Sequence, residues 1–479
     1  MNDEDLLNRK ENKMMKSILC VAMASASTLL WAFDTPEVSN VQMSQEPIGR
    51  KVTITYKLSN ALNGAVITLD VETNRTGTAT NVDADWISIG GVAVCNAQGA
   101  VWRKVTPADA DGEGWYTITW NPDLSWEGHE VPLASGGARA VVTAWALDNT
   151  PDYMVVDISA AAQRNTQRYY PGVDFLPGSV PGQQGAITNN LAYRCSMIVM
   201  RKIMAKDVVW TMGSVDEYDR NADTEATHQV SLTNNYYIGV FETTQNQWAL
   251  VAASTARTAP QYFSVNGGMR PVERTSYNEL RCCALGAHRS DGGHWPASPY
   301  ENSFLWRLRD KTGIDFDLPS EAEWEFAARA GHGNRLWGNG NYMTSNNVSD
   351  SSLLGMARFK GNEGKNTADA NTAPEDGGTA ICGTYQSNKW GLYDMHGNVM
   401  ELCLDWYEAS ITNNNGRVNI DVSTPANTLS GATGSNRVRR GGYYGAAASA
   451  CRSASRGSLA TGSTHLSTGF RLAYRAGLK

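Results

Sequence analysis

The hydrophobic pattern of this chain changes near residue 160, and no other feature of the sequence restricts the possible folds as strongly. Between residues 37 and 160, apolar side chains alternate with polar ones, and Asn, Gly and Asp clusters separate the alternating segments. A period of two is typical of half-buried strands. The sequence therefore predicts a β-sandwich over residues 37–160. Its expected strands cover residues 52–58, 67–71, 115–120, 140–147 and 153–158.

Several short strands with turn residues between them favour a sandwich of the immunoglobulin or fibronectin type III kind, which would act as a spacer or in adhesion. Residues 161–194 follow, with Pro171, Pro177 and Pro181 and no persistent period, so we expect a linker there. A second domain should occupy residues 195–479. A chain of 479 residues agrees with more than one domain.

The second half of the chain has short helices with well-defined starts. Three Ser/Thr-x-x-Glu/Gln capping boxes predict them, at Thr244–Gln247, Ser276–Glu279 and Ser320–Glu323. Gly331 should end the third helix. Long Gly/Asn-rich stretches at 331–347 and 362–378 lie between the expected helices. Compact domains rarely contain such loops unless ligands or ions hold them.

The N-terminus predicts export. Three lysines precede an apolar run over residues 18–32 that is short for a membrane span, and polar residues follow it. We expect a signal peptide over residues 1–32, and no transmembrane segment after its cleavage. The protein would then be secreted, periplasmic or on the cell surface. The alternative is an uncleaved membrane anchor. A net charge of −7 and the lack of a Lys/Arg run argue against nucleic acid as a partner.

Five sequence motifs in the second half resemble successive signatures of the formylglycine-generating enzyme family, also called sulfatase-modifying factors. The motifs are 271–277 (PVERTSY), 318–329 (LPSEAEWEFAAR), 390–401 (WGLYDMHGNVME), 437–442 (RVRRGG) and 469–471 (GFR). The resemblance implies an irregular α/β fold related to the C-type lectin fold, with bound calcium. It also implies oxidation of a sulfatase cysteine to formylglycine.

The resemblance also implies a set of calcium ligands. Asp394 and Glu401 match its side-chain ligands, whereas Gly397 and Val399 match its carbonyl ligands. Carboxylates and carbonyls are the ligands that calcium prefers, and Gly397 permits a tight turn. Asn347 would begin a second calcium site. The alternative is that these carboxylates only cap loops by accepting hydrogen bonds from backbone amides.

One departure from the family concerns its chemistry. The resemblance implies two cysteines, five residues apart, that bind copper(I) through soft thiolates. They would fall at Ala446 and Cys451, so half of the pair is missing. Copper binding is therefore not expected, and the enzyme class stays open. One alternative is a sulfatase-modifying oxidase that uses other residues and has a sulfatase as its partner.

The segment from Tyr443 to Thr468 contains no Lys, Asp, Glu, Asn, Gln, Met or Trp. Such a composition resembles the variable loops that diversity-generating retroelements produce, although a small-residue loop without that history is the alternative. Surfaces of small and tyrosyl residues are suited to binding. We therefore expect a surface for an extracellular protein or glycan, unless the protein is purely structural. Its residues would be Tyr443, Tyr444, Ser458, Leu459, Thr461, Ser463, Thr464 and His465. Tyr444 could instead pack inward.

Overall fold

A computed structural model describes most of the chain from residue 35 onward. The described residues are 35–74, 83–126, 136–159, 161–178, 186–215, 217–252, 268–287, 290–333, 337–341, 343, 350–362, 378–408, 419–420 and 435–475. The predicted signal peptide and Asn347 lie outside these ranges. Among the described residues, no helix combines the length and the apolar character needed to cross a membrane.

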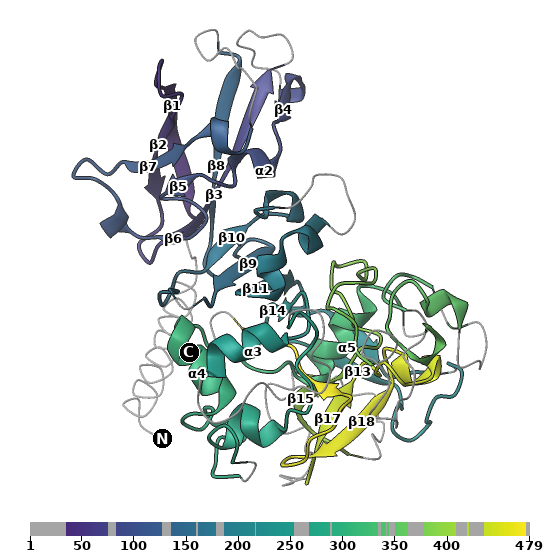
Figure 1. Ribbon diagram of the computed structural model, residues 1–479. Coiled ribbons are helices and arrows are strands. Elements are labelled where there is room, and N and C mark those ends of the chain that lie inside the picture. The colour runs from purple at the N-terminus through teal and green to yellow at the C-terminus, as the bar shows by residue number, and fades with distance from the viewer. Residues whose placement is uncertain are drawn as a thin grey trace, which may run out of the picture.

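The N-terminal part of the chain forms two antiparallel sheets around one core (Figure 1). The first sheet has the order β1-β2-β7-β5 and the second β4-β3-β6, with β8 also paired to β3. Side chains of β2 alternate between buried and partly exposed, which confirms the predicted period of two. The immunoglobulin-like topology stays a prediction. The bounds are β1 Glu37–Gln45, β2 Val52–Ser59, β3 Ala65–Asn74, β4 Trp86–Ser88, β5 Gln98–Gly99, β6 Lys104–Val105, β7 Tyr116–Trp120 and β8 Ala138–Trp145.

A five-stranded sheet joins the two halves of the chain, and it corrects the predicted boundary. Its order is β10-β9-β11-β14-β20. Strand β9 was expected in the sandwich, but it pairs with β11, where Met197 lies opposite Asp157 and Arg201 opposite Tyr153. The expected linker supplies β10, which pairs with β9. A period of two reveals a strand but not its partner, so the boundary at residue 160 was wrong. The bounds are β9 Tyr153–Asp157, β10 Arg168–Tyr170, β11 Met197–Ile203, β14 Tyr236–Gly239 and β20 Ala473–Tyr474.

All three predicted capping boxes are present. The Ser320 hydroxyl accepts a hydrogen bond from the Glu323 amide, and the Glu323 carboxylate accepts one from the Ser320 amide. The helix ends at Arg329, because Ala330 already has the left-handed conformation with φ 49°. The helices of this part are α3 Gln245–Ala252, a π-helix Asn278–Cys282, α4 Phe304–Thr312 and α5 Glu321–Arg329, and a short α2 covers Gly91–Val94 in the N-terminal part.

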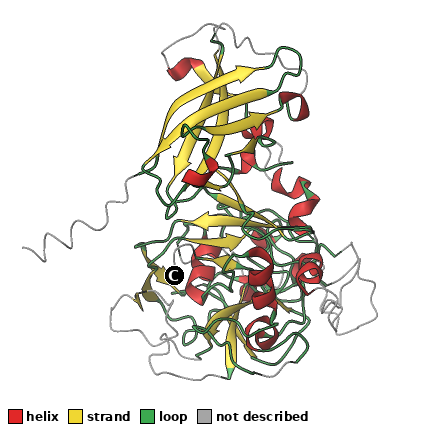
Figure 2. Ribbon diagram, turned by 90° about the vertical axis from the view of Figure 1, so that its left-hand side faces the viewer, coloured by secondary structure: helices red, strands yellow, loops and turns green. Residues whose placement is uncertain are grey.

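Two smaller sheets complete the C-terminal module below the N-terminal sheets (Figure 2). One has the order β12-β13-β16 and the other β18-β17-β15-β19. Their bounds are β12 Val209–Met212, β13 His228–Ser231, β15 Met400–Trp406, β16 Asn419–Ile420, β17 Asn436–Arg440, β18 Arg456–Ala460 and β19 Thr468–Gly469. Short 3-10 turns connect the elements: Asp83–Asp85, Pro107–Asp109, Pro122–Leu124, Val173–Phe175, Ala186–Asn189, Leu191–Arg194, Ser351–Leu353, Lys360–Asn362 and Ala448–Cys451.

One hydrophobic cluster runs from the N-terminal sheets into the C-terminal module. It begins with Ile54 and Tyr56 on β2 and continues through Val155 on β9 and Val199 on β11 to Tyr393. The two halves therefore share a core. The mixture of short helices and short strands agrees with the irregular α/β architecture expected for residues 195–479.

Candidate functional site

The segment expected to bind a ligand is anchored by two glycines after β17. Gly441 and Gly442 have φ values of 97° and 72°, in the left-handed region that favours glycine. A Cβ on Gly442 would lie 2.5 Å from the Cys451 sulfur and 2.8 Å from the Ala450 oxygen. The chain therefore needs glycine here, so that the turn can pack directly on the Ala448–Cys451 helix.

The two positions that correspond to the copper cysteines lie in an apolar cluster. Ala446 and Cys451 are both buried and pack with Trp337, Met356 and Phe359. Burial raises the pKa of the Cys451 thiol to about 12, so it is protonated at neutral pH. All seven cysteines of the described residues are free thiols. One neutral thiol and an alanine in an apolar cluster do not fit copper(I), which requires a pair of thiolates.

A buried histidine lies beside this cluster. His396 is 1% exposed, and its Nδ1 donates a hydrogen bond to the Cys451 carbonyl at 2.9 Å. Its Nε2 accepts from the Gly338 amide at 3.1 Å. Burial lowers the pKa of His396 to about 4. The imidazole is therefore neutral and fixes the position of the Ala448–Cys451 helix.

The structure separates the expected ligand-binding residues into buried and accessible ones. Tyr444 is buried at 4% exposure, so its assignment to the surface was wrong, because its ring packs edge-on against Tyr443 with the ring centroids 5.5 Å apart. Tyr443 is half-buried. Strand β18 lies at the edge of its sheet and carries two of the expected residues. Ser458, Leu459, Thr461 and Thr464 are half-buried, and Ser463 and His465 are exposed.

The hairpin after β18 is held by the motif at residues 271–277 and the π-helix after it. The Arg274 amide donates to the His465 carbonyl at 3.1 Å, and the Asn278 amide donates to the Thr461 carbonyl at 2.9 Å. The backbone of the expected binding surface therefore has a fixed course, while side chains on it remain partly accessible.

The residues expected to bind calcium have two different surroundings. The Glu401 carboxylate is fully buried and accepts hydrogen bonds from Arg471 at 2.6 and 2.7 Å and from the Trp324 indole at 2.7 Å. Both of its oxygens are therefore engaged by protein donors. Gly397 lies at a tight approach, because a Cβ there would be 2.4 Å from the Arg358 carbonyl oxygen. Val399 donates its amide to Glu242 at 3.1 Å.

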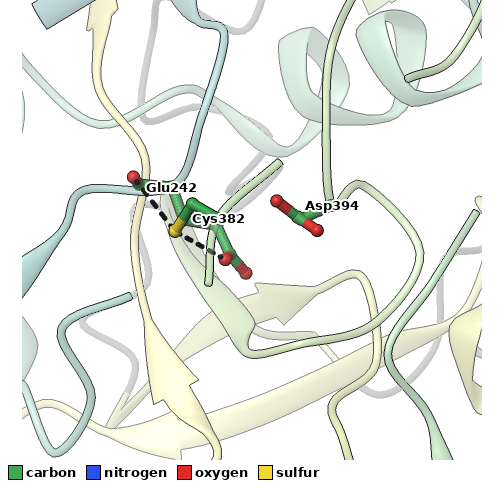
Figure 3. A group of neighbouring side chains, drawn as sticks. All are labelled: Glu242, Cys382 and Asp394. Atoms are coloured by element: carbon green, nitrogen blue, oxygen red, sulfur yellow. Dashed lines mark hydrogen bonds between the residues drawn. The ribbon is translucent and has the colours of Figure 1, made fainter. Parts of the chain in front are cut away.

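Asp394 lies beside two residues that the sequence did not indicate, Glu242 and Cys382 (Figure 3). One ligand atom from each of the three lies within 4.8 Å of the others, and all three residues are buried. The Cys382 sulfur is 3.6 Å from Oε2 of Glu242. Asp394 Oδ2 accepts from the Gly383 amide at 2.7 Å, whereas Oδ1 is buried and has no hydrogen-bond partner.

The two carboxyls of this cluster tend to hold a proton when no cation is bound. Burial, together with the charges of Asp394 and Glu401, raises the pKa of Glu242 well above its usual range. Burial raises the pKa of Asp394 to about 6. The nearby cation Arg471 is already paired with Glu401. Two close carboxylates with one unpartnered oxygen could hold a divalent cation such as calcium.

Sequence reasoning missed Glu242, Cys382 and His396 as members of these clusters. Glu242 stands two residues before Thr244, and a carboxylate that follows the apolar pair Val240–Phe241 in a strand-to-helix turn was the signal available. Cys382 gives no local signal, since Glu242 lies 140 residues away in the chain.

Comparison with known proteins shows what the C-terminal module is similar to. Residues 199–476 match the model of the sulfatase-modifying factor enzyme 1-like domain. The chain is 30% identical to "Chaperone protein LppX" of Paenibacillus barcinonensis over 36% of this chain and 63% of that protein. It is 34% identical to the formylglycine-generating enzyme of Thermomonospora curvata over 33% of this chain and 48% of that enzyme. These matches thus span less than two thirds of either relative.

The mouse formylglycine-generating enzyme is 27% identical over 55% of this chain and 72% of that enzyme. Among solved structures, the chain is similar to Treponema denticola variable protein 1, with a TM-score of 0.42 and 23% identity. That likeness covers 58% of this chain and 95% of the other. PvdO of Pseudomonas aeruginosa follows with a TM-score of 0.40 and 21% identity, over 58% of this chain and 94% of PvdO.

Proposed function

The chain belongs to the sulfatase-modifying factor family, and from this premise we propose that it is an exported, non-catalytic binding protein. The observation that carries the proposal is the apolar packing around Ala446 and Cys451, where the family's copper-binding thiolates would be. Without a thiolate pair the oxidation of a substrate cysteine has no metal to support it. The relative that is named as a chaperone supports a role other than formylglycine formation.

The ligand would contact the surface made by Tyr443, the edge strand β18 and the hairpin up to His465. Tyr443 offers a large contact area and a hydroxyl at a low cost in rotamer entropy. The ligand would be an extracellular protein or glycan, and the segment's composition suits diversification by a retroelement. Gly441 and Gly442 before the surface and Arg471 after it hold the ends of the segment, so side chains can vary on a fixed backbone.

The cation of this proposal is calcium, held by Asp394 and Glu242 beside Cys382. A bound cation would neutralise two buried carboxylates and hold the loop that contains Gly383 and Asp394. Chelation should therefore lower the melting temperature, and a site filled at 100 times its Kd would contribute about 2.7 kcal/mol to the free energy of unfolding. The double variant Glu242→Gln and Asp394→Asn should lose this response. Equal melting curves with and without chelator would refute the calcium proposal.

A direct assay separates the binding protein from the oxidase. Purified protein should not convert a Cys-x-Pro-x-Arg peptide to formylglycine, with or without added copper. Mass spectrometry would detect the product, and a wild-type formylglycine-generating enzyme is the positive control. Conversion by this protein would favour the alternative, a sulfatase-modifying oxidase with a sulfatase as its partner.

Ligand capture tests the surface itself. Tyr443→Ala should weaken capture of an identified ligand by roughly thirtyfold, in line with truncation of an aromatic anchor, and should leave the melting temperature nearly unchanged. Phe470→Ala is the contrasting variant, because Phe470 is fully buried against Trp248 and Phe304 and its loss should damage the fold. Unchanged capture by Tyr443→Ala would point away from this surface.

A further inference from the structure

Arg439 lies on β17, close to two residues of the proposed binding surface, and in the part of the chain that the structure describes its charge has no acidic partner. Its Nη1 donates a hydrogen bond to the Thr468 hydroxyl at 2.7 Å, and its Nε is buried without a hydrogen-bond partner. Among the described residues, no carboxylate forms an ion pair with it. The side chain is half-buried, so part of it stays within reach of solvent.

Three nearby arginines of the module have acidic partners, whereas Arg437 on the same strand forms no ion pair with a described carboxylate and instead donates to the Leu404 carbonyl. Arg440, the next residue of the strand, is fully buried and pairs with Glu325. Arg452 pairs with Glu217 and Glu225 at 2.8 and 2.6 Å, and Arg456 pairs with Glu321. An unpaired charge away from water is costly, so proteins usually pair it or leave it for a ligand.

The surroundings of Arg439 are rich in donors. The half-buried Tyr443 lies close enough to the guanidinium to influence the pKa of Arg439, which burial lowers. The imidazole of His465, which is exposed, also lies near the guanidinium. Burial and then the positive charge of Arg439 lower the pKa of that histidine. The Thr468 hydroxyl already accepts a hydrogen bond from Arg439. A group that accepts hydrogen bonds and carries negative charge would complement this set.

We propose that Arg439 recognises an oxyanion of the ligand, a carboxylate or a sulfate. The inference rests on the proposed function in one respect, because it takes the surface around Tyr443 and His465 as the face that meets the ligand. A guanidinium presents planar paired donors that match the oxygens of either group. Tyr443 would add contact area, and its hydroxyl could donate to the same anion.

Anion titration of the full-length protein tests the proposal. Sodium sulfate and sodium acetate serve as separate probes at constant ionic strength, and NMR follows the imidazole resonances of His465. We expect a saturable shift with at least one probe in the wild type. Arg439→Gln should weaken that binding at least tenfold. The control Arg164→Gln removes an equal charge from an exposed pair with Asp310 and should bind like the wild type.

Two results of this titration would contradict an anion site at Arg439. Wild-type resonances that do not saturate with either probe, or equal binding by Arg439→Gln, would overturn the proposal. If Arg439→Gln does not fold, Arg439→Lys keeps the charge but loses the planar fork, and it should bind each probe more weakly; equal binding would again overturn the proposal. Sulfate binding without acetate binding would identify a sulfated ligand group, and the reverse a carboxylated one. A last combination separates the two proposals. If the wild type binds an anion saturably but Tyr443→Ala still captures an identified ligand as tightly as the wild type does, the proposed surface is refuted and the anion site is not.

Discussion

Charged side chains occupy the interior of the C-terminal module, and Glu401 and Arg471 form one such pair. Both side chains are fully buried, and the shorter contact is 2.6 Å. Arg471→Gln would leave the Glu401 carboxylate buried without its counter-charge. We expect the free energy of unfolding to fall by about 3–5 kcal/mol. Urea unfolding at pH 7 measures it.

The control for this variant is an exposed pair. Arg164 and Asp310 each expose 60% of their side chains, so Arg164→Gln should change the free energy of unfolding by less than about 1 kcal/mol. A similar small effect of Arg471→Gln would mean that the buried pair contributes little to stability.

His396 should make stability depend on pH. Its pKa is about 4 in the folded protein, below the ordinary value of 6.5, because the ring is buried. Between pH 6.5 and pH 4 the unfolded chain therefore binds a proton that the folded protein does not. Stability from this residue is complete above pH 6.5 and falls by about 3 kcal/mol as the pH drops to 4. Urea unfolding at pH 7 and pH 4.5 should show a smaller decrease in His396→Gln; an equal decrease would contradict the assignment.

At the scale of elements, helix α5 gives the most local test. Ser320→Ala removes the hydroxyl that accepts from the Glu323 amide. The expected loss is about 1 kcal/mol, measured by thermal unfolding. Ser320→Asp is the matched control, since aspartate also caps helices, and it should retain most of the stability. Equal losses in both variants would indicate that packing rather than capping matters at this position.

The sequence predicts those features whose interacting residues lie close together along the chain. The capping boxes at Thr244, Ser276 and Ser320 were predicted because each acts over three residues. The strands β2 and β3 were predicted because the alternation of apolar and polar residues is local, although burial alternates only along β2. The partner of β9 was not, since the same pattern suits either sheet. The cluster of Glu242 with Cys382 joins residues 140 positions apart, and no local pattern reports such a contact.

The candidate site divides in the same way. The absence of a thiolate pair follows from reading Ala446 in the sequence. The burial of Tyr444 depends on the packing of a loop after two left-handed glycines, and the sequence left both orientations open. Glu401 has the residue type of a calcium ligand, but its role in the structure is set by Arg471, which approaches from the far end of the chain.

At the scale of the whole molecule, the shared sheet predicts where the chain can be divided. A fragment that begins at residue 161, the boundary indicated by the sequence, lacks β9, which pairs with both β10 and β11. A fragment from residue 148 keeps β9 and also Asn149, which accepts from Lys202 at 3.0 Å. We expect the longer fragment to be soluble with a cooperative thermal transition, and the shorter one to aggregate or to unfold without a transition. Equal transitions would show that β9 is dispensable.

The apolar cluster around Ala446 and Cys451 has a consequence for the history of this domain. Ala446→Cys would provide two thiols at this position. The thiols would stay protonated, because Trp337, Met356 and Phe359 form an apolar environment around them. Several neighbours would have to become smaller or more polar at the same time, and each such step alone would leave a void or an unsatisfied polar group. The present packing therefore opposes a stepwise change to a copper-binding site. A single substitution at Ala446 should therefore not create a copper-binding thiolate pair at this site.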